Sequence, residues 1–237
     1  MELPSSAAML VDLALKAVDP YSAAAVYVVA DAKDKRELEE VMFGKRRDAL
    51  ALARWEHTPA SVLEALTGLS DAAIVLRLDK NQNTPAQALS KLYVAESQRS
   101  KTGSTLTVLV AQHRHASLSV LKNIAQFEYD KASLLAVSNN LAANSEVLSI
   151  LLGRLELSAL SEALQKNISE HPSASSQLLE QLYDKDDVYV KAAVIRHANC
   201  PQRLIELAVD DENVLIQRQL AADERLSIEV ITRLSLH

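Results

Sequence analysis

The sequence predicts an all-α protein in which pairs of short helices stack as a solenoid. Of its 237 residues 49% are hydrophobic but only 4% are aromatic, so the apolar mass is aliphatic. Only four residues are glycine, whereas an average chain of this length has about 17. This scarcity argues against sandwiches, barrels, Rossmann folds and P-loops, which depend on glycine turns. The third observation is a helical signature that recurs along the chain.

The signature occurs seven times without internal gaps. In each copy an apolar anchor is followed three residues later by a second apolar residue, a spacing that marks one buried face of a helix. Successive anchors are 26, 32, 27, 31, 26 and 26 residues apart. The anchors are Leu63, Leu89, Leu121, Leu148, Leu179, Ile205 and Ile231.

The residues around the anchors predict where helices begin and end. Pro59, Pro85 and Pro201 lie four residues before an anchor, and proline favours the first turn of a helix. A second helical stretch lies between consecutive signatures. Four of the five stretches open with an acidic residue, which suits a helix N-terminus, and they are expected to end at Asn81, Asn139, Asn167, His197 and Asp223. Each repeat is therefore two helices, and stacking of the repeats would bury one continuous core.

The N-terminal region, residues 1–56, is expected to hold two short helices, 5–18 and 21–32, and a degenerate repeat. In that repeat Leu38 and Val41 form the apolar pair, and residues 48–54 form the second helix. About seven repeats follow in residues 57–237. We expect one elongated domain over residues 1–237.

The pattern resembles the bacterial leucine-rich repeat variant proteins and the broader HEAT and armadillo class. The resemblance covers roughly residues 48–237 and is best at 57–63, 83–85 and 199–201. It implies a right-handed superhelix of two-helix HEAT-like repeats and a tendency to bind macromolecules. Two departures are the repeat length, which can be near 24 residues in that family, and the single Cys200, which rules out carrying over a cysteine-bound iron–sulfur cluster.

Composition restricts the partners and the compartment. Lys and Arg number 25 against 31 Asp and Glu, a net charge of −6, which disfavours general nucleic-acid or anionic-membrane binding. A single cysteine gives no indication of an oxidising compartment. Asp12, Lys16 and Asp19 interrupt the apolar N-terminal stretch, which is unlike a signal peptide. We expect a cytoplasmic protein that does not span or bind a membrane.

No arrangement of residues predicts catalysis, a cofactor or a metal. The pair His113 and His115 has no third zinc ligand at a suitable spacing. Cys200 precedes a helix, where small or apolar residues stand in other repeats. The acidic runs 184–187 and 210–212 fall at turns and lack the EF-hand spacing, so they are expected to cap helices. The protein is therefore predicted not to be an enzyme.

Basic residues supply the candidate binding site. Lys80, Lys166 and Arg196 are aligned near the ends of second helices, with Ser138 and Ala222 at the equivalent positions of other repeats, and stacked repeats could place such residues in a stripe. A polar insertion at 96–104 lies in the longest spacing, and insertions often map to a binding edge. The further candidates are Arg77, Lys191 and Arg218 on second helices, and Arg99 and Lys101 in the insertion.

Two functions and one mode of assembly remain open from the sequence. The preferred function is a non-enzymatic scaffold that binds another protein or a peptide through a curved surface. The alternative is a HEAT-like nucleic-acid-binding or alkylbase DNA glycosylase-like protein, although the lone Trp55 lies in an apolar stretch that is expected to be packed. Residues 226–237 are expected to form an apolar helix without a covering partner, and the mode of assembly left open is a homodimer through this terminal repeat.

Overall fold

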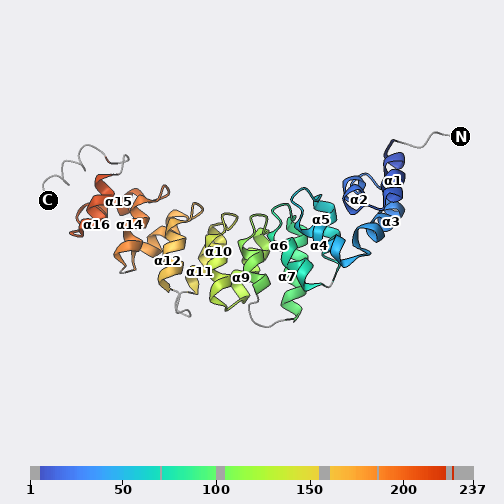
Figure 1. Cartoon of the computed structure of the whole chain (residues 1–237). Coiled ribbons are helices and arrows are strands. Elements are labelled where there is room, and N and C mark those ends of the chain that lie inside the picture. The colour runs from blue at the N-terminus through green and yellow to red at the C-terminus, as the bar shows by residue number, and fades with distance from the viewer. Residues whose placement is uncertain are drawn as a thin grey trace. The chain divides into compact units, whose positions relative to one another are not determined.

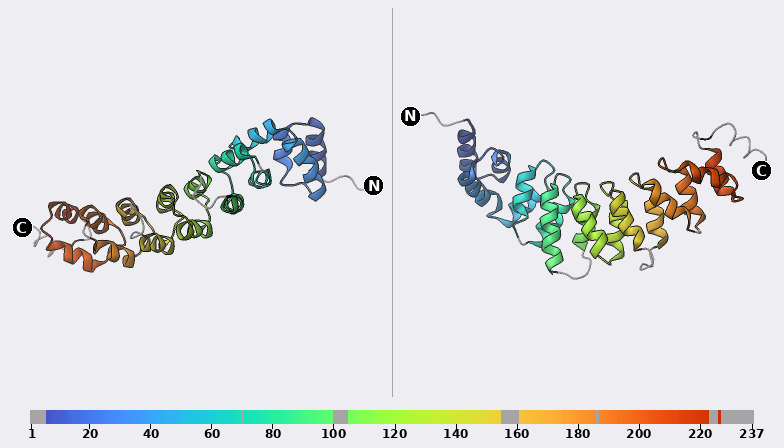
Figure 2. Two further views of the ribbon diagram at one scale, coloured as in Figure 1. Left: turned by 90° about the horizontal axis from the view of Figure 1, so that it is seen from below. Right: turned by 180° about the vertical axis from the view of Figure 1, so that it is seen from behind.

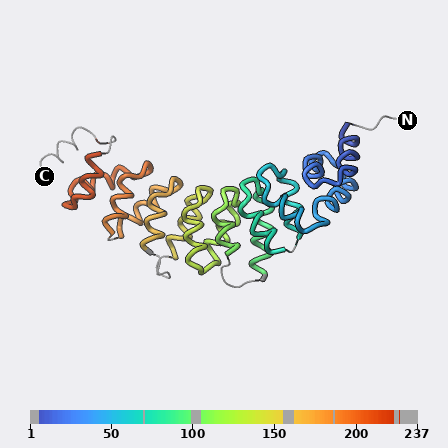
Figure 3. Tube along the Cα trace, in the orientation of Figure 1, coloured from blue at the N-terminus to red at the C-terminus, as the bar shows by residue number. Residues whose placement is uncertain are grey.

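The fold is all-α, as the sequence predicts. The computed structural model describes residues 6–69, 71–99, 105–154, 161–185, 187–222 and Leu226, and these residues contain sixteen α-helices and no strand (Figure 1). The helices are short, and neighbouring helices pack on one another in the manner of a helical repeat. Figure 3 traces the alternation of helix and turn along the chain.

The chain divides into two compact units, Met1–Val120 and Leu121–His237. The boundary falls within one helix, α9 (Leu118–Phe127), and each unit is described by itself. The single elongated domain over residues 1–237 stays a prediction.

The first unit begins with a helical pair and continues with two-helix repeats. We call the signature-bearing helix of each repeat its first helix and the following one its second helix. Here the first helices are α3, α5 and α7, and the second helices α4, α6 and α8 pack in succession. The bounds are α1 Ser6–Ala17, α2 Pro20–Val26, α3 Ala32–Phe43, α4 Arg46–Arg54, α5 Ala60–Leu66, α6 Ala72–Lys80, α7 Ala86–Arg99 and α8 Thr105–Gln112.

The second unit repeats the same arrangement. Its second helices α10, α12, α14 and α16 pack in succession, and the left view of Figure 2 shows the helices of this unit in two rows. The bounds after α9 are α10 Lys131–Asn139, α11 Ser145–Gly153, α12 Ser161–Glu170, α13 Ser176–Tyr183, α14 Val188–Arg196, α15 Gln202–Val209 and α16 Val214–Ala221.

The recurring signature supplies the core. Six anchors are buried: Leu63, Leu89, Leu121, Leu148, Leu179 and Ile205, and Ile231 lies outside the described residues. The acidic residues that open second helices act as caps. Asp71, Asp130 and Asp187 each accept hydrogen bonds from two backbone N–H groups in the first turn of their helices, which satisfies donors that the helix itself leaves unpaired.

The degenerate repeat near the N-terminus is present as α3 and α4. Its fully buried pair is Leu38 and Met42, whereas Val41 is only half-buried, so the helix presents an i, i+4 face rather than the expected i, i+3 pair. Val18, which follows α1, has a φ of 51°, an uncommon conformation for a β-branched residue.

Three expectations about helix boundaries are wrong. The helix expected over 21–32 ends at Val26, and Asp31 caps the next helix, α3. The second helix expected to end at Asn167 continues to Glu170, because the residue that leaves the helix is His171, whose helical conformation is disfavoured by the following Pro172. Residues 96–99 of the expected polar loop belong to α7, and residues 100–104, with Gly103, lie outside the described residues.

Candidate functional site

Within each unit, a set of polar side chains links the turns that follow the second helices. We call it the turn ladder, and its members are Asn81, His113, Asn140, His171 and His197. Four are buried and His197 is half-buried. In every member a side-chain atom accepts a hydrogen bond from the backbone N–H two residues later. The ladder therefore fixes the shape of each turn.

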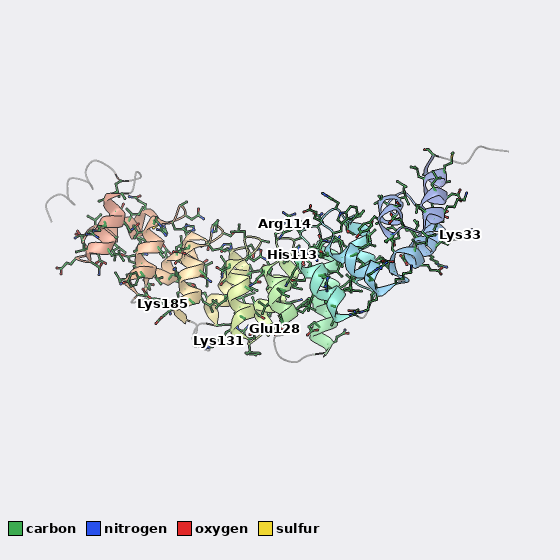
Figure 4. All side chains as sticks on the ribbon, in the orientation of Figure 1. Lys33, His113, Arg114, Glu128, Lys131 and Lys185 are labelled. Atoms are coloured by element: carbon green, nitrogen blue, oxygen red, sulfur yellow. The ribbon has the colours of Figure 1, made fainter. Side chains whose placement is uncertain are left out.

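In the first unit the turn ladder also joins one repeat to the next. The Asn81 amide donates to the carbonyl oxygens of Ala53 and Trp55, at 3.0 and 2.9 Å. His113 Nε2 lies 3.0 Å from the Asn81 carbonyl oxygen. Because His113 Nδ1 accepts the N–H of His115 at 3.1 Å, the proton of the neutral ring must be on Nε2, which donates to Asn81. Figure 4 labels His113 at this turn.

The second unit repeats this bonding. His171 Nε2 donates to the Asn140 carbonyl oxygen and His197 Nε2 to that of His171, both at 3.0 Å. The Nδ1 atoms of the two rings accept the backbone N–H groups of Ser173 and Asn199, at 3.1 and 3.0 Å. Each ring thus uses both nitrogens within the fold, and the histidines of the ladder are structural.

The histidines and the cysteine that the sequence offers as candidate metal ligands or reactive groups are hydrogen-bonded in or beside the turn ladder. His115 Nδ1 lies 3.0 Å from the Thr84 carbonyl oxygen, so the His113–His115 pair is engaged with the backbone of the preceding turn. Cys200 is half-buried, and its N–H donates to His197. Among the described residues no group of three or more His, Cys, Asp or Glu residues is placed to hold a metal.

A groove of about 570 Å³ crosses the second helices of the second unit. It brings together two of the predicted binding residues, Lys166 of α12 and Arg196 of α14. Arg196 also lies 3.5 Å from Glu170. The floor is apolar, and the rim carries Tyr189, which is 75% exposed. The groove is also lined by Glu162, Ala163, Glu170, Asp187, Val190, Ala193 and Leu215.

The expected column of Lys80, Lys166 and Arg196 is not formed. Lys80 and Arg196 each directly precede a ladder residue, but the residue that directly precedes His171 is Glu170. Lys166 lies one turn earlier in its helix, because α12 extends three residues beyond its expected end. The position before a ladder residue therefore holds basic, neutral and acidic residues rather than a basic stripe: Lys80, Gln112, Asn139, Glu170 and Arg196.

The remaining candidates in the second unit and the insertion are scattered. Lys191 Nζ lies 5.7 Å from the centre of the Tyr183 ring, outside the groove lining. Arg218 is exposed on α16. Arg99 ends α7, but its side chain and the whole of Lys101 lie outside the described residues.

The first unit brings Arg77 and Lys80 together with a residue that the sequence reasoning missed. Arg54, in the last turn of α4, lines a pocket of about 480 Å³ with Arg77 and Lys80 of α6. We call it the basic pocket. Its other lining residues are Leu76 and Asn81. Within the described part of the chain, no carboxylate lies within 4.0 Å of these three cations.

Asp79 is a second residue whose role the sequence did not reveal. It is 4% exposed in α6, and its Oδ1 atom has no hydrogen-bond partner. Burial raises the pKa of its carboxyl from 3.8 to about 7, against a smaller opposing effect of Lys80. Around neutral pH a substantial part of Asp79 is therefore uncharged and does not neutralise the neighbouring cations.

Trp55 is half-buried and its ring packs edge-on against Tyr21, with centroids 5.0 Å apart. Residues 227–237, which would form the dimer face, lie outside the described residues. Within the described ranges, none of the helices combines the length and the hydropathy that a membrane span requires.

The comparisons with protein-family models, with curated proteins and with solved structures each find no match.

Proposed function

We propose that this protein is a non-enzymatic scaffold that binds another protein or a peptide on the surface formed by its second helices. In this proposal the repeats are HEAT-like and form a right-handed α-solenoid, as the resemblance to the leucine-rich repeat variant proteins implies. The groove of the second unit is the observation that carries the proposal, because it combines an open apolar floor with polar groups at its rim.

The groove has the composition of a protein-binding surface. Ala163, Val190, Ala193 and Leu215 offer apolar contact area, while Tyr189 can supply a large amphipathic contact, a residue type enriched at interfaces. Lys166 has no carboxylate within 4.0 Å among the described residues, so its charge remains available to a ligand.

On the first helices two lysines are paired across repeats, whereas Lys166 has no such partner among the described residues. Lys91 of α7 lies 2.7 Å from Glu64 of α5, and Lys122 of α9 bonds to Glu146 of α11. Such exposed pairs contribute little stability, but they leave fewer charges without partners. This contrast favours the second-helix surface as the binding side.

The nucleic-acid alternative gains no support from the groove. A phosphate backbone would meet Glu162, Glu170 and Asp187 there, and phosphate affinity depends on an excess of Lys and Arg. The mixed charge suits a peptide, which can itself carry both signs.

A subtractive selection tests the proposal. A displayed library of random peptides is depleted on the variant Ala193→Tyr, which fills the groove, and is then selected on the wild-type protein. We expect enriched peptides that bind wild type at least tenfold more tightly than Ala193→Tyr. The matched control is Glu206→Tyr, which places the same side chain on the exposed surface of the first helix α15 and should bind like wild type.

Two outcomes would overturn the proposal. One is the absence of any enriched peptide although both variants melt at the wild-type temperature. The other is equal loss of binding in Ala193→Tyr and Glu206→Tyr, which would show that the peptides do not depend on the groove.

A further inference from the structure

We infer that the first unit carries a separate subsite for an acidic side chain of a bound peptide, with a large apolar residue of the same peptide beside it. The basic pocket of Arg54, Arg77 and Lys80 would bind the oxyanion. This inference rests on the proposed function, but it concerns the first unit only, so each can fail without the other.

The positive charge of the basic pocket exceeds the partial negative charge of the two helix C-termini beside it. Arg54 lies in the last turn of α4, and Arg77 and Lys80 lie in the last turn of α6. A helix C-terminus carries roughly −0.5 of a charge, so the two termini offset about one of the three positive charges. About two remain, and no carboxylate lines the pocket. A carboxylate or a phosphorylated side chain would supply the missing counter-charge.

The chemistry of the donors also suits an oxyanion. Guanidinium groups present planar forks of N–H donors that match carboxylate and phosphate oxygens. Arg77 Nη1 donates to the Ala73 carbonyl oxygen at 3.0 Å, which holds this side chain along its own helix and leaves its other donors available. Arg54 approaches from the neighbouring helix, so an anion between them would bridge α4 and α6.

An apolar pocket of about 410 Å³ lies on the other side of α6. Leu76 lines both pockets and is 42% exposed, so it forms a shared wall between them. The other apolar residues of this second pocket include Leu69, Val75, Leu92 and Leu106. A peptide that crosses α6 over Leu76 would therefore contact the basic pocket and the apolar pocket together.

The width of a helix sets the spacing of the two peptide residues. Pockets on the two sides of one helix are separated by about 10 Å, the diameter of a helix with its side chains. A peptide in the polyproline II conformation covers this distance in about three residues, at about 3.1 Å per residue, and its side chains return to the same face after three residues. The subsite should thus prefer an acidic residue and a large apolar residue three positions apart.

Synthetic peptides test this preference. The probe is a fluorescein-labelled twelve-residue Gly/Ser peptide with Leu at position 5 and Glu at position 8. Three partners replace Glu by Gln, replace Glu by phosphoserine, or replace Leu by Ser. Binding to the full chain is measured by fluorescence anisotropy at about 50 mM salt, where exposed charges are weakly screened. We expect the Gln and Ser peptides to bind at least fivefold more weakly than the Leu–Glu probe, and the phosphoserine peptide to bind more tightly.

The protein variants assign the effect to the pocket. Arg54→Gln combined with Lys80→Gln should abolish the difference between the Glu and Gln peptides. Lys33→Gln combined with Lys45→Gln removes the same net charge from exposed positions elsewhere in the first unit and should preserve the difference. Thermal melts confirm that both double variants fold.

Several results would overturn the inference. One is equal binding of the Glu and Gln peptides to the wild-type protein. Another is a difference in affinity between these two peptides that persists in Arg54→Gln/Lys80→Gln. The third is the loss of that difference in the Lys33→Gln/Lys45→Gln control. Tighter binding of a twelve-nucleotide single-stranded DNA, dependent on Arg54 and Lys80, would assign the pocket to nucleic acid instead. None of these results bears on the groove of the second unit, which the subtractive selection tests separately.

Discussion

Lys80 and Asn81 are consecutive residues with opposite roles. The Asn81 amide is buried and bonded to two carbonyl oxygens of the preceding repeat. The Lys80 ammonium is exposed and has no carboxylate within 4.0 Å in the described part of the chain. The comparison of the turn ladder with the basic pocket therefore separates polar groups that hold the repeats together from polar groups that remain available to a ligand. Variants of the ladder should change stability, and variants of the pocket should change binding.

The largest expected effect is that of Asn81→Leu on stability. This change removes the amide bonds to Ala53 and Trp55 and the acceptor of the Asn83 N–H, and buried groups left unpaired cost about 1–3 kcal/mol each. We expect the free energy of unfolding, measured by urea denaturation, to fall by about 3 kcal/mol. Asn83→Ala, which loses one exposed bond to Glu56, should cost well under half as much. Equal losses would show that the ladder is not a distinct stabilising element.

A substitution of Asp79 should instead increase the free energy of unfolding. Residues at the equivalent position of neighbouring second helices include Ala53 and Ala111, so Asp79→Ala should fit the packing and remove a buried carboxyl. Because its pKa rises from 3.8 in the unfolded chain to about 7 in the folded protein, the unfolded state loses its proton first as pH rises. Asp79 therefore reduces stability progressively between about pH 4 and pH 7.

We expect Asp79→Ala to stabilise the protein by about 2 kcal/mol at pH 8 and by much less at pH 4. Urea denaturation at the two pH values measures both gains. A gain that is the same at pH 4 and pH 8, or a loss at pH 8, would contradict this assignment.

A smaller, pH-dependent effect on stability is expected for His113→Asn. Asparagine is the residue that the turn ladder has at positions 81 and 140. Burial lowers the pKa of His113 below its ordinary value of 6.5. The unfolded state therefore binds the proton first as pH falls, and stability present above about pH 6.5 is lost below it. Protonation of Nδ1 would also break the bond from the His115 N–H.

His113→Asn should be close to wild type at pH 7.5 and should become more stable than wild type by about 1 kcal/mol at low pH, the value of one buried hydrogen bond. Thermal denaturation from pH 7.5 to pH 5 measures the difference. An unchanged difference across this range would mean that His113 does not contribute to the acid sensitivity.

Much of the fold could be predicted from the sequence, because the aliphatic anchors, helix-starting prolines and capping aspartates act locally. The turn ladder was only partly recognised, although it leaves a clear signal. Trp55, Asn81, His113, Asn140, His171 and His197 each lie eight residues before an anchor. The turn between a second helix and the next first helix thus has constant length. The repeats differ in length at the other edge, where α7 has 14 residues and α5 has 7, and where Ser161 begins α12 seven residues after Arg154. Figure 4 labels Glu128, Lys131 and Lys185 along that other edge of the second unit.

The candidate site was harder to predict, since it depends on which side chains of separate helices meet. Arg77 and Lys80 were recognised as basic residues on a second helix, but Arg54 joins them only through the packing of α4 on α6. Asp79 could not be separated from an exposed charge without knowledge of its burial. The predicted alignment of Lys166 with Lys80 and Arg196 is wrong because α12 continues three residues beyond Asn167.

The central claim is that the second helices, and not the turns or the first helices, form the binding surface. It is tested most directly by backbone amide NMR shifts of the full chain on addition of the Leu–Glu probe and, separately, of a peptide from the groove selection. We predict that the largest shifts fall in α4 and α6 for the probe, and in α12 and α14 for the selected peptide. Largest shifts in the first helices α5 and α13, or in the ladder turns at 82–85 and 172–175, would contradict the claim.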